Sequence, residues 1–170
     1  MKRLAILRHA KTEPPASGMA DFDRALEERG RGDAQAIGTA MAARGWRFDL
    51  VLASPAQRVR ETLDGIQQAL SFDGEVRFEP RLYEAGAGQV KELLRQVPDA
   101  FESVLVAGHN PTMQQVVLDL TDHDAQGLRD VVRMKYPTGA LSVIELSAAT
   151  WEALAPGALV DLILPSDVAG

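Results

Sequence analysis

The sequence predicts an α/β domain with a mostly parallel central sheet, and three features carry this prediction. Continuous apolar runs at residues 4–7, 50–53 and 104–107 are typical of strands buried on both faces. Segments with helical spacing of apolar residues lie between and after these runs. The chain has 170 residues, of which 46% are hydrophobic and 25% charged. We therefore expect residues 1–170 to form a single domain with its own core.

The first half of the chain gives local signals for each element. Residues 11–20 contain two prolines and a glycine, which indicate a loop. Residues 32–43 have helical spacing, and Gly45 is expected to end that helix. Ser54 and Pro55 follow the second apolar run and are expected to act as N-cap and first residue of a helix that reaches about Leu70.

The second half alternates in the same way. Residues 75–78 alternate polar and apolar, which predicts a strand near an edge of the sheet. Helices are expected over residues 89–97, ended by Pro98, and from Pro111 to about Leu120. Residues 121–124 are interpreted as a polar loop. Residues 140–146 and 158–164 are expected to form an antiparallel strand pair, because little chain separates them.

Composition excludes several classes of function. The net charge of −6 argues against broad affinity for nucleic acid. The chain has no cysteine, which excludes disulfides and thiolate zinc sites. No stretch has the length of a membrane-spanning helix. We expect a cytoplasmic protein without a bound metal, since the acidic neighbours of His123 all come from one short loop and would not complete a metal shell.

Chemically distinctive residues stand where three of the predicted strands end. Arg8 and His9 follow the first apolar run, Arg58 lies shortly after the second, and His109 follows the third. Because the carboxyl ends of parallel strands meet at one edge of a sheet, these four side chains are expected to share one crevice.

Two arginines and two histidines in one crevice are suited to phosphoryl transfer. Guanidinium groups bind phosphate oxygens in bidentate fashion, and phosphoryl transfer is catalysed mainly by positioning and charge stabilisation. A neutral His9 could attack phosphorus, so that the reaction proceeds in two steps through a phosphohistidine. A protonated His109 would add a third cationic donor. The two histidines are therefore expected to hold opposite charge states.

Five segments in this order resemble the histidine phosphatase superfamily, whose members include phosphatases and phosphoglycerate mutases. Short length, Arg-His-Ala-Lys and Gly-His-Asn-Pro make the chain most similar to the small branch of phosphohistidine phosphatases typified by SixA. The matching segments are Leu7–Thr12, Asp23–Leu26 with Gly30, Ser54–Arg58 with Thr62, Leu82–Ala85 and Gly108–Thr112.

The resemblance implies a three-layer α/β/α sandwich, no metal or organic cofactor, and a role for each matching residue. His9 would be the phosphorylated nucleophile, and Arg8, Arg58 and His109 would form the phosphate pocket. Glu84 matches the place of a proton-donating carboxylate in many members. The implied substrate is phosphohistidine on a signalling protein. Thr12 is a further candidate phosphate ligand, with loop capping as the alternative.

Two questions stay open at the level of sequence. The proton donor could be Glu84, Glu13, Asp21, Glu61 or solvent, because an imidazole leaving group needs less acid catalysis than an alkoxide. The substrate could also be a small phosphomonoester, or the chain could bind phosphate without turnover. A mutase is less expected, because retaining an intermediate favours a closed site that a short chain has little length to build.

Overall fold

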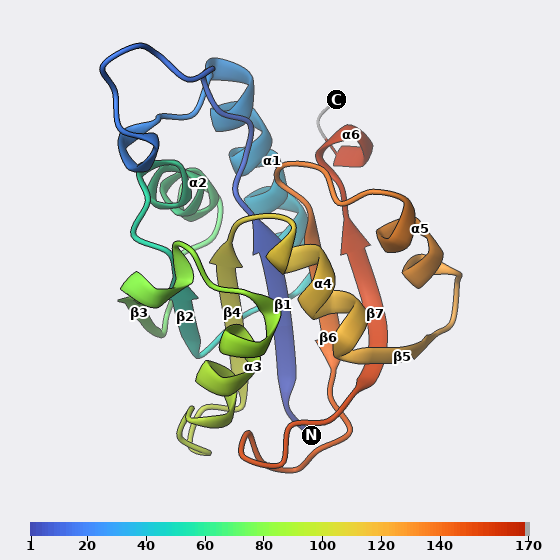
Figure 1. The fold of residues 1–170 in the computed structure, drawn as a ribbon. Coiled ribbons are helices and arrows are strands. Elements are labelled where there is room, and N and C mark those ends of the chain that lie inside the picture. Colours follow the sequence, from blue (N-terminus) through green and yellow to red (C-terminus); the bar gives the residue numbers. More distant parts are fainter. Residues whose placement is uncertain (169–170) are drawn as a thin grey trace.

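Seven strands form one mixed sheet in the computed structural model of the chain, which describes residues 1–168 (Figure 1). The strand order across the sheet is β3-β2-β4-β1-β6-β7-β5. The strands are β1 (Arg3–Arg8), β2 (Leu50–Ala53), β3 (Glu75–Phe78), β4 (Ser103–Gly108), β5 (Thr121–Asp124), β6 (Leu141–Glu145) and β7 (Gly157–Ile163).

Parallel pairing dominates the sheet. Strands β3, β2, β4 and β1 are parallel to one another, and β5 is parallel to β7. Only β6 is antiparallel to the strands beside it, β1 and β7. The mostly parallel sheet, the antiparallel pair near the end of the chain and the edge position of β3 are all as predicted from the sequence.

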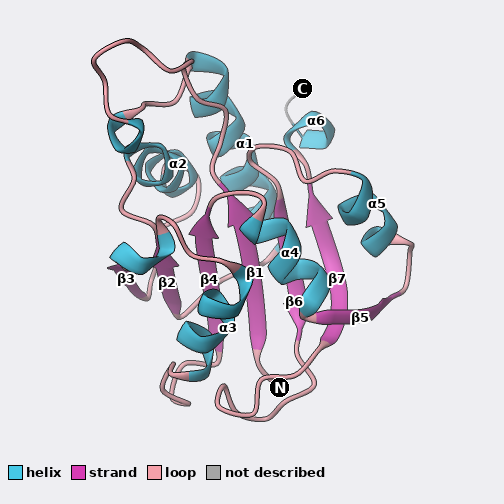
Figure 2. Ribbon diagram, viewed as in Figure 1, coloured by secondary structure: helices cyan, strands magenta, loops and turns pink. Residues whose placement is uncertain are grey.

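Helices cover both faces of the sheet and complete the predicted three-layer sandwich (Figure 2). Helices α1, α2 and α6 pack on one face, and α3, α4 and α5 on the other. Two short 3₁₀ helices, η1 and η2, lie in connecting loops. The helices are η1 (Asp21–Asp23), α1 (Glu28–Arg44), α2 (Gln57–Gln67), η2 (Pro80–Leu82), α3 (Ala87–Arg95), α4 (Thr112–Asp119), α5 (Leu128–Met134) and α6 (Pro165–Val168).

The apolar run of β1 explains why the sheet needs helices on both faces. Successive strand side chains point to opposite faces. Leu4 and Ile6 join the core beneath α3 and α4, whereas Ala5 and Leu7 join the core beneath α1 and α2. All four side chains are fully buried. This central strand is therefore held in place by two separate hydrophobic cores, and it carries the site residues at its carboxyl end.

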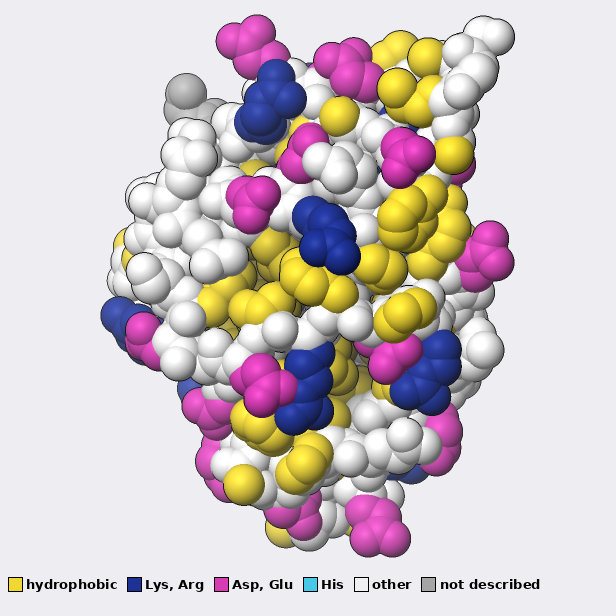
Figure 3. Space-filling model, turned by 90° about the vertical axis from the view of Figure 1, so that its left-hand side faces the viewer, with side chains coloured by type: hydrophobic (Ala, Val, Ile, Leu, Met, Phe, Trp, Pro, Cys, Tyr) yellow, Lys and Arg dark blue, Asp and Glu magenta, His cyan; other side chains and the backbone are white. Residues whose placement is uncertain are grey.

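The edge of the sheet at β3 is protected by charged side chains. Phe78 is 38% exposed there, and the Arg60 guanidinium lies 3.9 Å from the centre of its ring. The face seen from this side of the molecule shows apolar side chains gathered between charged ones (Figure 3). Charged groups at an edge strand hinder pairing with a second chain.

Helix boundaries differ from the predicted ones at two places near the site. Ser54 is not an N-cap and Pro55 is not helical, because α2 begins only at Gln57, after the N-cap Ala56, and it ends at Gln67. The Ser54 hydroxyl does accept a hydrogen bond from the Ala56 amide, at 3.3 Å, but as part of a turn that precedes the helix. A serine before a proline therefore marked the approach to the helix and not its first turn.

Helix α1 begins four residues before the predicted position. Its first turn, Glu28–Arg31, lacks apolar periodicity and contains Gly30, so pattern alone missed it. Gly30 is needed there for space, since a Cβ at this position would overlap the carbonyl group of Lys11. This close approach seats the start of α1 against the loop that follows β1.

The predicted polar loop at residues 121–124 is wrong, because these residues form β5. The strand is short and lies at the far edge of the sheet, where it pairs only with β7. Its middle residues Asp122 and His123 are exposed, so no apolar alternation signals a strand. The seven-residue helix α5 was missed for a similar reason, since it buries only Val132.

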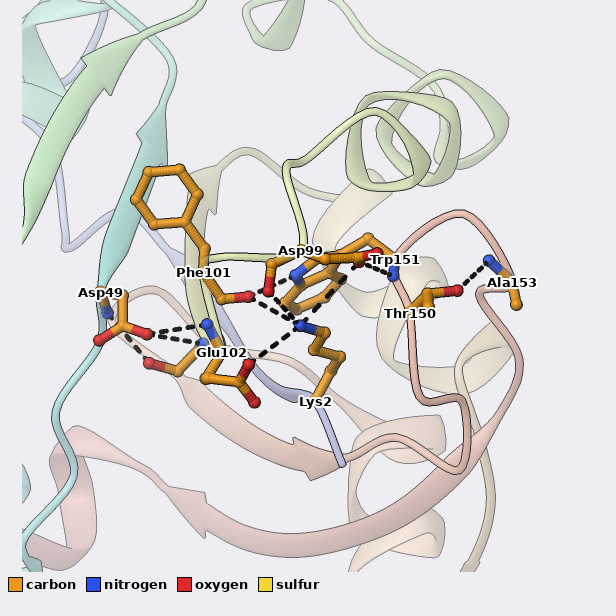
Figure 4. A network of polar contacts seen from close by, with 9 residues as sticks. Lys2, Asp49, Asp99, Phe101, Glu102, Thr150, Trp151 and Ala153 are labelled. Carbon is orange, nitrogen blue, oxygen red and sulfur yellow. Dashed lines mark hydrogen bonds and ion pairs between the residues drawn. The ribbon is translucent and has the colours of Figure 1, made fainter.

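A buried lysine ties the amino terminus of β1 to two loops at the end of the sheet opposite to the site (Figure 4). Lys2 is 3% exposed, and its Nζ donates to the carbonyl groups of Asp99 at 2.7 Å and Phe101 at 3.2 Å. Glu102 lies 3.3 Å from the same nitrogen. Trp151 donates its indole N–H to the Phe101 carbonyl at 2.7 Å.

Within residues 1–168, no helix has both the length and the apolar character that crossing a bilayer requires.

Removing the positive charge of Lys2 should destabilise the fold without affecting the site. We expect Lys2→Met to lower the free energy of unfolding by about 2 kcal/mol, because buried acceptors lose a charged donor. Urea denaturation followed by circular dichroism measures the change. Lys135→Met is the matched control, since Lys135 is exposed. Equal stability of the two variants would show that the Lys2 contacts are energetically neutral.

Candidate active site

The carboxyl ends of β1, β2 and β4 meet at one edge of the sheet, as the sequence predicted. The β1–β4 register pairs Leu7 with Ala107 and Arg8 with Gly108. The pairing continues beyond the strand, because the His9 amide donates to the Gly108 carbonyl at 3.1 Å. The Ser54 amide donates to the Ala107 carbonyl at 3.0 Å from the β2 side. These bonds place His9 and His109 next to each other.

The two histidines lie with their ring centres 5.4 Å apart. His9 is 7% exposed, and its Nδ1 lies 2.8 Å from the carbonyl oxygen of Ala10. A carbonyl only accepts hydrogen bonds, so Nδ1 carries the proton and Nε2 keeps the lone pair. His109 has its Nε2 at 2.8 Å from the Ser54 hydroxyl. Ser54, which was predicted to be a helix cap, thus contacts the site.

The two arginines are held by backbone carbonyl groups. Arg8 donates from a terminal nitrogen to the carbonyl of Tyr136 at 2.9 Å. Arg58 is 6% exposed and donates to the carbonyl of Asp21 at 2.8 Å and to its carboxylate at 3.0 Å. Asn110 donates to the same Tyr136 carbonyl at 3.2 Å and so links the loop after β4 to Arg8.

Three buried nitrogens of these residues have no hydrogen-bond partner within residues 1–168. They are Nε of Arg8, Nε of Arg58 and Nδ1 of His109. Unpaired buried polar atoms are rare in proteins and cost free energy, so several in one place call for an explanation. An oxyanion is the ligand that would satisfy donors of this kind.

Thr62 connects the segment that follows β1 to the helix that follows β2. Its hydroxyl accepts from the Ala10 amide at 2.9 Å and donates to the Arg58 carbonyl at 2.7 Å. Thr62 is 1% exposed, so this bridge is shielded from water. It joins the residue that follows His9 to the helix that carries Arg58.

Both imidazoles are neutral at pH 7. Burial, together with the nearby groups of His109, Arg58 and Arg8, lowers the pKa of His9 to about 3 against the opposing hydrogen bond to Ala10. Burial, and next the charge of Arg58, lower the pKa of His109 to about 4. The neutral state expected for His9 agrees with these shifts. The cationic state expected for His109 does not, because burial and then the two guanidinium groups disfavour a third positive charge.

The aromatic side chain of Tyr83, for which the sequence predicts no role, borders the site. The Tyr83 ring lies edge-on to His109 with ring centres 5.6 Å apart, and its hydroxyl donates to the Asp21 carboxylate at 2.7 Å. Phe22, which is 37% exposed, lies edge-on to Tyr83 at 5.1 Å. The only signal for Tyr83 in the sequence was its place in the Leu82–Ala85 segment.

The structure separates the four carboxylates considered as proton donor. Glu61 accepts from the Leu26 amide at 2.8 Å and from Gln57 at 2.8 Å, so it serves as a structural acceptor. Asp21 is bound to Arg58 and Tyr83. Hydrogen bonds from Tyr83 and then Arg58 lower the pKa of Asp21, which keeps it ionised. Glu13 and Glu84 are both exposed, and Glu84 directly follows Tyr83 at the border of the site.

Thr12 lies in the loop that follows His9. Thr12 is half-buried, and its backbone pairs with Leu26 in an isolated bridge that closes the loop after His9. Its role as a phosphate ligand stays a prediction.

The described part of the chain has no group of three or more histidine, aspartate or glutamate side chains arranged to hold a metal ion.

Comparison with known proteins places this geometry in a family. The model of the histidine phosphatase superfamily (branch 1) matches residues 4–103. A protein of Mycobacterium tuberculosis is 35% identical over 164 residues, which cover 94% of this chain and 99% of that protein.

Two solved structures share the fold over nearly the whole chain. Both are assigned as the phosphohistidine phosphatase SixA. The protein from Agrobacterium tumefaciens has 29% identity and a TM-score of 0.81, covering 96% of this chain and 98% of its own. The protein from Nakamurella multipartitia has 26% identity and a TM-score of 0.81, covering 96% of each chain. The predicted sandwich and the predicted enzyme class, a phosphatase with a histidine nucleophile, are thereby confirmed. The chain belongs to the histidine phosphatase superfamily.

Proposed function

We propose that this chain hydrolyses phosphohistidine carried by a protein, with His9 as the nucleophile. The observation that carries the proposal is the His9 imidazole, which is neutral, buried and fixed as the Nδ1–H tautomer beside two guanidinium groups and a second imidazole. Its Nε2 lone pair is available for in-line attack on phosphorus. In the first step the P–N bond of the substrate breaks, a new P–N bond forms to His9, and the leaving imidazole takes up a proton.

Water completes the reaction in a second step. It attacks the phosphorus of phosphorylated His9, releases inorganic phosphate and restores the neutral imidazole. In both steps Arg8, Arg58 and His109 stabilise the charge on the three equatorial oxygens of the phosphoryl group. The unpartnered Nε atoms of the arginines and Nδ1 of His109 supply donors for these oxygens.

Two observations support a protein substrate. The two solved SixA structures give the substrate class by their names and share 29% and 26% identity with this chain. The side chains that border the site are also accessible, since Asp21 is 55% exposed and Phe22 37% exposed. An open border admits a phosphorylated side chain that projects from a folded protein.

Covalent labelling tests the nucleophile. Brief incubation with a radiolabelled phosphohistidine protein, followed by rapid denaturation, should label the wild type and not His9→Asn, because only a histidine nitrogen forms the P–N bond. His123→Asn is the matched control, since His123 is exposed on β5. Label on the His9→Asn variant would refute the assignment of His9.

Substrate comparison tests the substrate class. We expect kcat/KM on a phosphohistidine protein to exceed that on sugar phosphates and phosphoglycerates. A preference for one of the small esters would identify a small-molecule phosphomonoesterase of the same family. Phosphate binding without label or turnover on any substrate would identify a binding module.

Glu84 is the proposed proton donor for substrates with a poor leaving group. Glu84→Gln should lower kcat on an alkyl phosphate about 10²-fold, because an alkoxide needs a general acid. Turnover of phosphohistidine and of an aryl phosphate should change little, since these leaving groups are better. Glu13→Gln, at an exposed loop position, is the matched control. An equal loss on all substrates would contradict a role in leaving-group protonation.

Proton uptake tests the role of His109. Because the pKa of His109 is held at about 4, the imidazole is neutral before an anion binds. A bound dianion favours the imidazolium form and raises that pKa, so binding takes up protons. Calorimetric titration with tungstate at pH 6, in buffers of different ionisation enthalpy, should show uptake that approaches one proton in the wild type and disappears in His109→Gln. Uptake that persists in the variant would assign it to another group.

A further inference from the structure

Asp21 makes more contacts with the site than any role assigned so far explains. It opens η1, in the loop that rises beside α2 (Figure 1). Its carbonyl oxygen accepts from one terminal nitrogen of Arg58 at 2.8 Å, and its carboxylate accepts from the other at 3.0 Å. Two acceptors from one residue thus fix the plane of the guanidinium group.

The Asp21 carboxylate is itself held by two further groups. The Tyr83 hydroxyl donates to the same carboxylate oxygen that binds Arg58, at 2.7 Å. Arg24 forms an ion pair with the other oxygen at 3.3 Å. Tyr83 in turn rests against His109. Asp21 therefore connects the two sides of the pocket, the arginine on α2 and the histidine after β4.

The chain around Asp21 is anchored to the residues next to His9. The Thr12–Leu26 bridge and the bond from the Glu13 amide to the Ala25 carbonyl, at 2.9 Å, close the base of its loop. Residues 14–23 of the loop are exposed, so few packing contacts hold it in place. The bonds of Asp21 and the contact of Phe22 with Tyr83 join the outer part of the loop to the site.

We propose that Asp21 is a positioning residue, which holds the Arg58 guanidinium in the orientation that leaves its Nε–H for the phosphoryl group. This inference rests on the proposed function. Arg58 has three nitrogens, and Asp21 engages both terminal ones, while Nε stays buried and without a partner in the described chain. Without Asp21 the long side chain regains rotational freedom, and orientation has to be imposed during the reaction.

The role of Asp21 differs from that of a proton donor and from that of a simple negative charge. A proton donor would act on the leaving group and its loss would depend on the substrate. A negative charge near the pocket would repel the substrate phosphate, so its removal would raise activity. A positioning residue acts only through Arg58, and its removal lowers kcat for every substrate while KM changes little.

A double-mutant cycle tests this role with an aryl phosphate and with a phosphohistidine protein. Asp21→Ala should lower kcat about ten-fold on both substrates, the order expected when a charged group loses a hydrogen-bond partner. In the Arg58→Ala background, the same Asp21→Ala change should have no further effect. Asp21→Asn, which keeps an oxygen acceptor, should recover part of the loss. Asp23→Ala, on the same short helix, should match the wild type.

Each other outcome decides against the proposal. An equal loss from Asp21→Ala with Arg58 present or replaced would show a general structural role, and thermal denaturation of each variant would register it. Unchanged or increased kcat would show that Arg58 needs no support. Absence of turnover and label in the wild type would instead refute the proposed function, so the two failures are distinguishable.

Discussion

The hydrogen bond from the His9 amide to the Gly108 carbonyl is the contact on which the arrangement of the site depends. It extends the β1–β4 ladder past the last paired residues, Arg8 and Gly108. From the other side, the Gly139 amide approaches the carbonyl groups of Arg8 and His9, at 3.1 and 2.9 Å. A slip of one residue would turn every side chain of β1 to the opposite face. The two buried cores that β1 faces exclude such a slip, and so hydrophobic packing fixes the position of the His9 imidazole.

The same packing creates an electrostatic cost. Two guanidinium groups and two imidazoles gather at one edge of the sheet, and burial lowers the pKa of Arg8. The protein reduces this cost by keeping both imidazoles neutral and by placing Asp21 against Arg58. Within residues 1–168, the hydrogen-bond acceptor of the Arg8 side chain is the carbonyl oxygen of Tyr136. The remaining positive charge, together with the unpaired donors, makes the site complementary to a dianion.

The sequence was sufficient to predict which residues at the strand ends meet in the site, and insufficient to predict which side chains surround them. Residues at the ends of buried strands are predictable because apolar runs mark the strands and parallel ends meet at one edge, which located Arg8, His9 and His109. The contacts of Ser54, Tyr83 and Asp21 depend on how turns and loops pack against each other. The periodicity of apolar residues in the sequence does not indicate this packing.

The elements that were missed share a physical cause with those contacts. Strand β5 and helix α5 bury few side chains, so the periodicity that reveals an element is absent from them. The early start of α1 depends on Gly30, whose missing side chain gives space to the Lys11 backbone. The pattern of hydrophobic side chains does not predict a tertiary contact that is made by backbone atoms.

The distribution of charged groups bears on the choice of leaving group. The proposed ligands of the phosphoryl group are largely buried side chains, whereas the proposed proton donor, Glu84, is exposed, and Asp21 and Glu61 are bound to other groups. An alkoxide leaving group demands a strong, well-positioned acid, and an imidazole does not, because its conjugate acid has a pKa of about 6.5 in water. Under the proposed function, a site with many anion-binding groups and few available acids favours cleavage of a P–N bond over that of an alkyl ester. The same balance explains why an open border is compatible with this chemistry, since solvent can deliver the proton that the protein does not hold in place.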